Sequence, residues 1–227
     1  MQKLITAILL GCTFVACAQT DFNYKRDFAN ILTRTKSSND VLSYKKLLTR
    51  FSACDTTLTD FDVLALLIGF TAKPAYNPYG TLDEEGAIYN LNGEGKFQEA
   101  LERGLKFLKT HPVAEKTLIE VSYAYHKLGK EDLADNYMWQ GDKIFKAMHF
   151  SGEGTGVEHP TFALGPTDGQ DYIHKFVRAD IGTMGSGSDK DGNFVDILEA
   201  KFKDGKTLTF YFVIEHATKK MFSGFLK

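Results

Sequence analysis

The chain has 227 residues, of which 43% are hydrophobic and 25% are charged, as in an ordinary soluble globular protein with one large or two small domains. Its formal net charge is −2, so it lacks the basic excess with which proteins follow a phosphate backbone, and we expect no nucleic-acid partner. The 18 phenylalanines and 10 tyrosines indicate a core built from large rings.

The first 18 residues have the pattern of a secretory signal peptide. Met1–Lys3 is a short positive start, and Leu4–Ala16 is an apolar run of 13 residues, which is too short to span a bilayer comfortably. Small residues at positions 16 and 18 then precede a cleavage site before Gln19. We therefore predict that residues 1–18 are removed and that the protein is exported to the periplasm or the extracellular space.

A lipoprotein signal is a second interpretation of the same segment. Residues 14–17 (FVAC) resemble a bacterial lipobox in which Cys17 is the lipidated residue. A lipid on Cys17 would anchor the protein at the outer membrane, and it is the only membrane contact that we expect. Beyond this segment Cys54 is the one remaining cysteine, so we predict no intramolecular disulfide.

Hydrophobic spacing predicts that residues 20–149 form a helical domain. Apolar residues recur at helical intervals in the segments 22–35, 41–51 and 59–70. The third of these is apolar most of the way round, which is typical of a buried helix. A tight turn follows, and its two tyrosines, Tyr76 and Tyr79, either line a groove or fill the gap between helices.

A repeat with a period of 34 residues organises the segment 82–148. It relates three pairs of positions: Tyr89 and Tyr123, Gly95-Lys96 and Gly129-Lys130, and Ala100 and Ala134. This is the period of a tetratricopeptide-type helix hairpin, and stacked hairpins present a concave face that suits an extended peptide. We therefore predict a partner-binding surface made by Tyr76, Tyr79, Tyr89, Asn90, Tyr123 and His126.

The composition changes at Phe150. Residues 150–156 are rich in glycine and predict a linker, and residues 157–227 predict a small α+β domain. Within that domain we expect a strand, a helix, and two further strands joined by the hairpin turn Asp204-Gly205, at 161–164, 170–178, 194–203 and 207–214. Residues 182–192 contain four glycines and no apolar stripe, so we predict a mobile loop there. The fold class is α+β: tetratricopeptide-like antiparallel helix hairpins, then a small domain with an antiparallel sheet.

Two resemblances to known families rest on particular segments. The segment 97–101 (FQEAL), His111-Pro112 and the stretches 123–125 and 128–130 resemble degenerate tetratricopeptide repeats. On a larger scale, residues 76–80 (YNPYG), 151–154 (SGEG) and the C-terminal strands are similar to a family of secreted Bacteroidetes proteins known as domain of unknown function 4919. That resemblance implies export and a helical half joined to a small α+β half. It implies no activity and no site residues.

One candidate metal site can be recognised, in the C-terminal loop. Asp189, Asp191 and Asn193 alternate along a glycine loop as calcium ligands do. An EF-hand would need a glutamate where the chain has Ala200, so a simple hairpin tip is the competing interpretation. The six histidines are scattered, and the chain has no G-x-S-x-G, P-loop or CxxC motif. We therefore expect no cofactor.

Two functional hypotheses follow from these patterns. The first is an exported, non-enzymatic interaction or scaffold protein that binds a peptide or protein partner through its helical repeat. The alternative is a metal-dependent or other enzyme that uses the C-terminal Gly/Asp-rich loop.

Overall fold

The structure is a computed structural model that describes residues 22–225. The predicted signal peptide and the lipid site at Cys17 lie outside these residues, as does the end of the predicted C-terminal domain. Within the described part of the chain, every helix is too short or too polar to cross a membrane.

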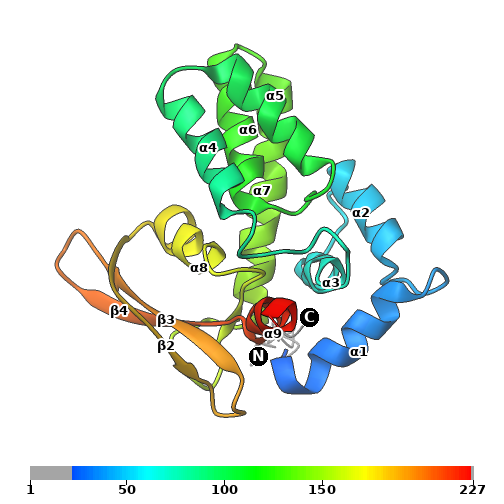
Figure 1. Ribbon diagram of the computed structural model, residues 1–227, viewed down its shortest axis with the longest axis vertical. Coiled ribbons are helices and arrows are strands. Elements are labelled where there is room, and N and C mark those ends of the chain that lie inside the picture. The colour runs from blue at the N-terminus through cyan, green and yellow to red at the C-terminus, as the bar shows by residue number, and fades with distance from the viewer. Residues whose placement is uncertain (1–21, 226–227) are drawn as a thin grey trace, which may run out of the picture.

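Seven helices form the first part of the described chain (Figure 1): α1 (Tyr24–Lys36), α2 (Tyr44–Ser52), α3 (Asp60–Phe70), α4 (Leu82–Gly93), α5 (Phe97–Leu108), α6 (Glu115–Lys127) and α7 (Glu131–Ser151). The rest contains β1 (Thr161–Phe162), α8 (Asp168–Asp171), the π-helical turn η1 (Tyr172–Val177), β2 (Asp180–Ser188), β3 (Phe194–Lys201), β4 (Thr207–Val213) and α9 (Glu215–Phe225). Helices thus precede a sheet, and the predicted α+β class is confirmed.

The glycines of the 34-residue repeat end two equivalent helices. Gly95 follows α4 with a φ of 76°, and Gly129 follows α6 with a φ of 71°. The next amide in each case closes the helix end, because Lys96 N–H donates to the Leu91 carbonyl and Lys130 N–H to the Tyr125 carbonyl, both at 2.9 Å. A left-handed backbone is unfavourable for a residue with a Cβ, so the recurring Gly-Lys pair is a helix stop.

The sheet has four strands in the order β1-β4-β3-β2. β3 pairs antiparallel with β4, as predicted, and also with β2, which was not predicted; the short β1 adds to the edge of β4 in a parallel direction, so the sheet is mixed rather than purely antiparallel. The prediction of a mobile loop at residues 182–192 is wrong for most of that segment, because β2 runs to Ser188 and pairs with β3. β2 is an exposed edge strand rich in glycine, so its sequence does not alternate between apolar and polar residues. Backbone hydrogen bonds to β3 hold it in place.

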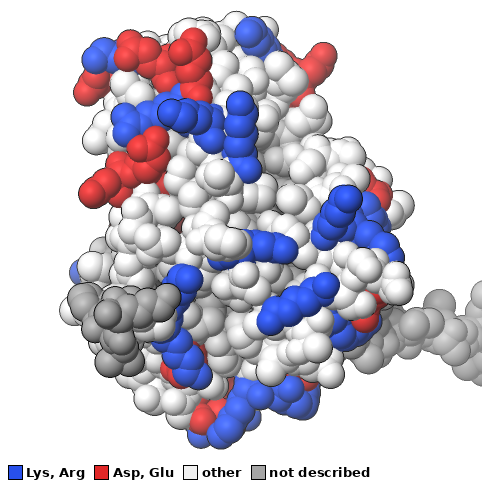
Figure 2. All heavy atoms as spheres, turned by 45° about the vertical axis from the view of Figure 1, so that its right-hand side comes forward, with Lys and Arg blue, Asp and Glu red and all other residues white. Residues whose placement is uncertain are grey.

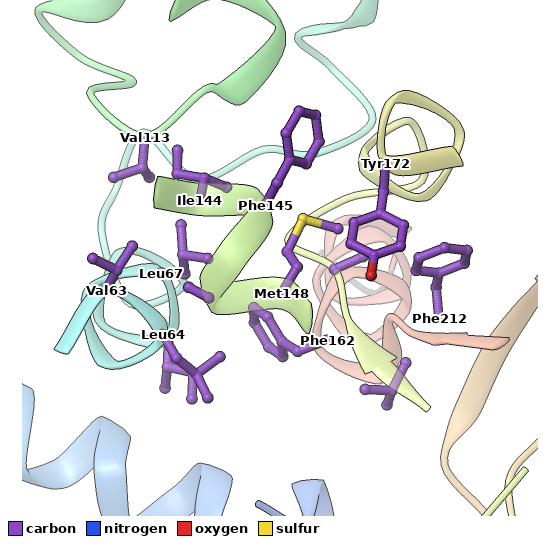
Figure 3. Packing of buried hydrophobic residues seen from close by; sticks show 14 of the residues in the cluster. Val63, Leu64, Leu67, Val113, Ile144, Phe145, Met148, Phe162, Tyr172 and Phe212 are labelled. Atoms are coloured by element: carbon purple, nitrogen blue, oxygen red, sulfur yellow. The ribbon is translucent and has the colours of Figure 1, made fainter. Parts of the chain in front are cut away.

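The larger of two hydrophobic clusters connects the helices to the sheet, and a smaller one lies among α5, α6 and α7. As predicted from its all-round apolar sequence, α3 is buried along its length. Figure 3 shows α7 in the middle of this core: Ile144 lies on the α3 side, and Met148 lies beside Tyr172. Because α7 ends at Ser151, the helix continues two residues into the predicted linker before Gly152.

His216 on α9 completes the core from the other end of the chain. Its ring stacks on Phe162 at 4.7 Å between centroids, and it also stacks on Tyr24 of α1 at 5.8 Å. Burial lowers the pKa of His216 to about 3, so the imidazole is neutral inside this stack of rings. The last helix is therefore packed against the first.

The charged surface is divided into small groups on the face of the molecule that carries α1 and α2. Figure 2 shows lysines and arginines on this face separated by uncharged atoms, with acidic residues gathered mainly at the upper end. This face of the described chain therefore presents no continuous basic surface.

Candidate functional site

Tyr76, the first of the predicted partner-binding residues, lies in the core. It is 2% exposed, and its hydroxyl donates a hydrogen bond of 2.7 Å to the Leu164 carbonyl. Its ring packs edge-on against Phe70 and stacks on His216. Of the two alternatives predicted for this tyrosine, filling the gap between elements is the one that the structure shows. Tyr79 is half-buried near Asp196, and burial raises the pKa of its hydroxyl.

The other four predicted residues lie on the surface of α4 and α6. Tyr89 is 57% exposed and Tyr123 is 42% exposed, and Asn90 and His126 are also exposed. The His126 Nδ1 atom lies 3.0 Å from a carboxylate oxygen of Glu131. Four of the six predicted residues are therefore exposed on α4 and α6, two helices that contact each other.

Both exposed tyrosines have a lysine over the ring. The Lys116 Nζ atom lies 5.7 Å from the Tyr89 ring centroid, and the Lys127 Nζ atom lies 5.1 Å from that of Tyr123. Lys116, Tyr123 and Lys127 share one face of α6 because their spacings are close to whole helical turns. Tyr89, Lys116, Tyr123 and Lys127 thus form one strip, which we call the tyrosine–lysine strip.

The predicted metal ligands form a self-contained turn between β2 and β3. One Asp189 carboxylate oxygen accepts hydrogen bonds from the backbone N–H groups of Asp191 and Asn193 at 2.9 and 2.8 Å. The other oxygen accepts from the Asn193 side-chain amide at 2.7 Å. The Asp191 carboxylate accepts from the side chain of Asn23, which ties the turn to the start of α1. Three of these oxygens therefore have structural hydrogen-bond partners.

A group of buried acidic residues, which the sequence interpretation missed, lies where α4, α6 and α8 meet. In Figure 1, α8 lies below the lower end of α4 and beside the sheet. Glu85 on α4 is 9% exposed and Glu115 at the start of α6 is 3% exposed, while Asp168 at the start of α8 is half-buried. We call these three residues the carboxyl cluster.

Burial controls the proton affinity of the carboxyl cluster. It raises the pKa of Glu85 to about 7, and the neighbouring Asp168 carboxyl adds to this effect. It also raises the pKa of Asp168 to about 7, although the backbone N–H groups of Gly165 and Leu164 donate to its carboxylate at 2.9 and 2.8 Å. Burial raises the pKa of Glu115 as well. Near neutral pH the cluster therefore holds protons that exposed carboxylates would release.

Lys175 on η1 contacts this region directly. Its Nζ atom lies 3.5 Å from a Glu115 oxygen and 3.2 Å from an Asp171 oxygen. Burial acts to lower the pKa of Lys175, but the Glu115 and Asp171 carboxylates outweigh it and the net direction is upward. The other Glu115 oxygen is buried and has no hydrogen-bond partner among the described residues.

A pocket opens beside the carboxyl cluster. The pocket is small, with a cavity volume of about 40 Å³, and Glu85 and Asp168 both line it. The remaining lining comes mainly from the end of α3, the 76–81 turn, the end of α5 and the segment before α8. Glu85 is buried with Ile88 and Asn92 along one face of α4, but two of these three side chains are polar, so apolar spacing in the sequence could not have located it.

The model of one protein family, described as Domain of unknown function (DUF4919), matches residues 29–222. The chain belongs to this family. The family resemblance expected from residues 76–80 and 151–154 is thereby confirmed, and the DUF4919 match includes every residue of the pocket and of the tyrosine–lysine strip. No curated protein and no solved structure matches the chain.

Proposed function

We propose that this DUF4919 protein is an exported, non-enzymatic interaction or scaffold protein of Bacteroidetes that binds a peptide or protein partner on the tyrosine–lysine strip. The observation that carries the proposal is the exposure of Tyr89 and Tyr123 on adjacent helices, at 57% and 42%. Tyrosine supplies a large contact area at low entropic cost and is enriched at interfaces.

Local structure supports the strip as a prepared contact surface. The Phe97 and Tyr123 rings pack in a T-shaped pair at 6.0 Å between centroids, so the tyrosine contacts the start of α5. Under the strip, the Asn92 side-chain amide donates to the Glu120 carboxylate at 2.8 Å and links α4 to α6. We also propose that these hairpins are tetratricopeptide repeats, which the matching Gly95 and Gly129 helix stops support.

Site-specific photo-crosslinking in cells of the source organism tests the binding proposal. p-Benzoylphenylalanine replaces Tyr89 or Tyr123, and the matched control carries it at Met184, which is 61% exposed on β2. We expect a discrete adduct from positions 89 and 123 that is missing from position 184. The proposal is refuted if the three positions give the same adducts or none.

Export and anchoring need a separate measurement. We propose cleavage after Ala18, with lipidation of Cys17 as the alternative, and mass spectrometry of the mature N-terminus separates the two. A chain that begins at Gln19 supports cleavage, whereas a diacylated Cys17 supports an outer-membrane anchor. A cytoplasmic chain that retains Met1 would contradict both.

An enzyme that uses the Gly/Asp-rich loop is the second candidate, and it has less support. Both oxygens of Asp189 accept hydrogen bonds within the turn, so a metal ion at this position would compete with the contacts that shape the loop. Calcium titration tests it: a rise in melting temperature at millimolar calcium that is lost in Asp189→Asn would favour this candidate.

A further inference from the structure

The segment that contains α1 and α2 carries a charge opposite to that of the rest of the chain. Residues 22–52, which we call the α1–α2 segment, contain seven basic and two acidic residues, a net charge of +5 in a chain whose total is −2. All other residues together therefore carry −7. An excess of one sign on one part of a surface attracts partners of the other sign, so this segment is suited to a negatively charged partner.

The connection between α1 and α2 holds a hydrophobic side chain out in the solvent, and it projects at the right-hand side of Figure 1. Val41 is 73% exposed, more than any other large hydrophobic residue among residues 22–225, while its neighbour Leu42 is 3% exposed. Asp40 fixes this geometry, because its carboxylate accepts two hydrogen bonds from the Arg34 guanidinium, at 3.0 and 3.1 Å, and one from the Leu42 N–H at 2.8 Å. An ordered turn therefore presents Val41 to the outside.

Three exposed lysines flank Val41 within five residues on either side, namely Lys36, Lys45 and Lys46. The ion pairs that the described chain forms in this segment use its arginines instead. The Lys46 Nζ atom donates to the backbone carbonyls of Asn39 and Asp40 at 3.4 and 3.2 Å, which holds it beside the turn. One exposed valine is ordinary on a protein surface, but an apolar tip among cations is the composition with which proteins contact anionic membranes.

We propose that the α1–α2 segment binds the surface of a membrane that contains anionic phospholipids. Val41 would enter the headgroup layer, and the three lysines would pair with lipid phosphates. Figure 2 shows the basic side chains of this face spread out, with uncharged atoms between them, which fits a planar layer of headgroups better than a linear polyanion. The contact uses no residue of the tyrosine–lysine strip, so it stands or falls separately from partner binding there.

The place of this segment in the chain also favours a membrane over a soluble acidic partner. Only residues 18–21 separate Cys17, the alternative lipid site, from Phe22. The five peptide steps from Cys17 to Phe22 reach at most about 18 Å, and α1 with its 13 residues is about 20 Å long. A lipid on Cys17 would hold the start of α1 near the bilayer, and the Val41 turn at the far end of α1 would make a second contact. A lipid and a basic surface together bind more firmly than either does alone.

Co-sedimentation with phospholipid vesicles tests the proposal. The protein is the lipid-free chain from Gln19, which includes every described residue, so the result does not depend on how Cys17 is processed. With about 30 mol% phosphatidylglycerol in phosphatidylcholine we expect at least about tenfold more binding than with phosphatidylcholine alone, and loss of this binding at about 0.5 M sodium chloride. The chain as a whole is negative, so its net charge predicts the reverse preference.

Two double variants with the same change in net charge separate a local contact from a global charge effect. Lys36→Gln with Lys45→Gln should weaken binding to the anionic vesicles about tenfold or more, because each lysine near such a surface contributes about fivefold. Lys109→Gln with Lys203→Gln, exposed at the end of α5 and in the β3–β4 turn, should stay within about twofold of the parent protein. Equal effects of the two pairs would overturn the proposal. Binding to neither kind of vesicle would also overturn it and would leave an acidic protein as the partner of this surface.

A fluorophore at the turn tests whether Val41 enters the headgroup layer. Val41→Cys is labelled with an environment-sensitive dye in a Cys54→Ser background, and the matched control carries the dye at Met184→Cys on β2. Anionic vesicles should shift the emission to the blue at position 41 and leave position 184 unchanged. No shift at position 41, the same shift at both positions, or an equal shift with free glycerol 3-phosphate would show that the turn does not insert into a membrane.

Discussion

The buried carboxyl of Glu85 makes the stability of the protein depend on pH. Its pKa is raised from 4.5 to about 7, so the folded protein holds this proton more tightly than the unfolded chain does. Stability therefore falls as the pH rises from 4.5 through about 7, and it is lowest once Glu85 is ionised. The gap between 4.5 and about 7, at about 1.36 kcal/mol per pH unit, sets an upper limit of about 3 kcal/mol on this loss.

Replacement of Glu85 by glutamine keeps the shape of the side chain and removes the titration. Near pH 8 we expect Glu85→Gln to be more stable than the parent protein by roughly 1–3 kcal/mol, or roughly 2–10 °C in melting temperature. Near pH 5 the two proteins should differ by less than about 0.5 kcal/mol, because the parent carboxyl is then protonated. Urea unfolding followed by circular dichroism at both pH values measures the difference.

The adjacent residue supplies a matched control. Glu84 forms two hydrogen bonds with the Arg103 guanidinium, at 2.8 and 2.6 Å, and this contact lowers the pKa of Glu84. Glu84→Gln should therefore cost a few tenths of a kcal/mol near pH 8, the opposite direction, because an exposed ion pair contributes little. If Glu85→Gln gives no gain near pH 8, or the same gain at both pH values, the burial argument for the carboxyl cluster is wrong.

Three further predictions concern the core and the helix ends. Phe145→Ala should lower the free energy of unfolding by about 3–5 kcal/mol, because Phe145 is 2% exposed in the cluster that joins helices and sheet. The urea midpoints of the helix and sheet signals should fall together, and separate transitions would show that the two parts unfold independently. Gly129→Ala should cost about 1–2 kcal/mol at its φ of 71°, and a neutral result in the same assay would contradict the helix-stop role. The pKa of His216 is lowered from 6.5 to about 3, so stability should fall by about 2–3 kcal/mol between pH 6.5 and pH 4.5. His216→Phe should lose this part of the pH dependence. If stability changes with pH as steeply in the variant as in the parent protein, His216 is not its cause.

The regular spacing of apolar residues and glycines allowed the helical part of the fold to be predicted. The apolar run of α3 predicted a buried helix, because a helix that is apolar all round is stable only inside the protein. The recurring Gly-Lys pair marks two equivalent helix ends, because glycine adopts the left-handed backbone that closes a helix. The same spacing relates Tyr89 to Tyr123, and both are exposed; that they bind a partner stays a prediction.

Features that depend on residues far away in the chain could not be predicted from the sequence. β2 forms because it can hydrogen-bond to the backbone of β3. The glycines and serines of β2 themselves give no sign of this pairing. Tyr76 belongs to a turn by local rules, yet it is buried because α3 and His216 close over it. Glu85 sits in a run of acids that suits any helix start, and only α6 and α8 make it a buried carboxyl.

The stack of His216 on Phe162 and Tyr24 has a consequence for the order of events during synthesis. The ribosome synthesises α1 long before α9, so Tyr24 of the first helix is made well before its ring partner His216. A nascent chain that stops before residue 216 leaves Tyr24 and Phe162 without this neighbour. The ring stack is therefore complete only after residue 216 has been synthesised, and until then Tyr24 and Phe162 stay accessible to chaperones and proteases.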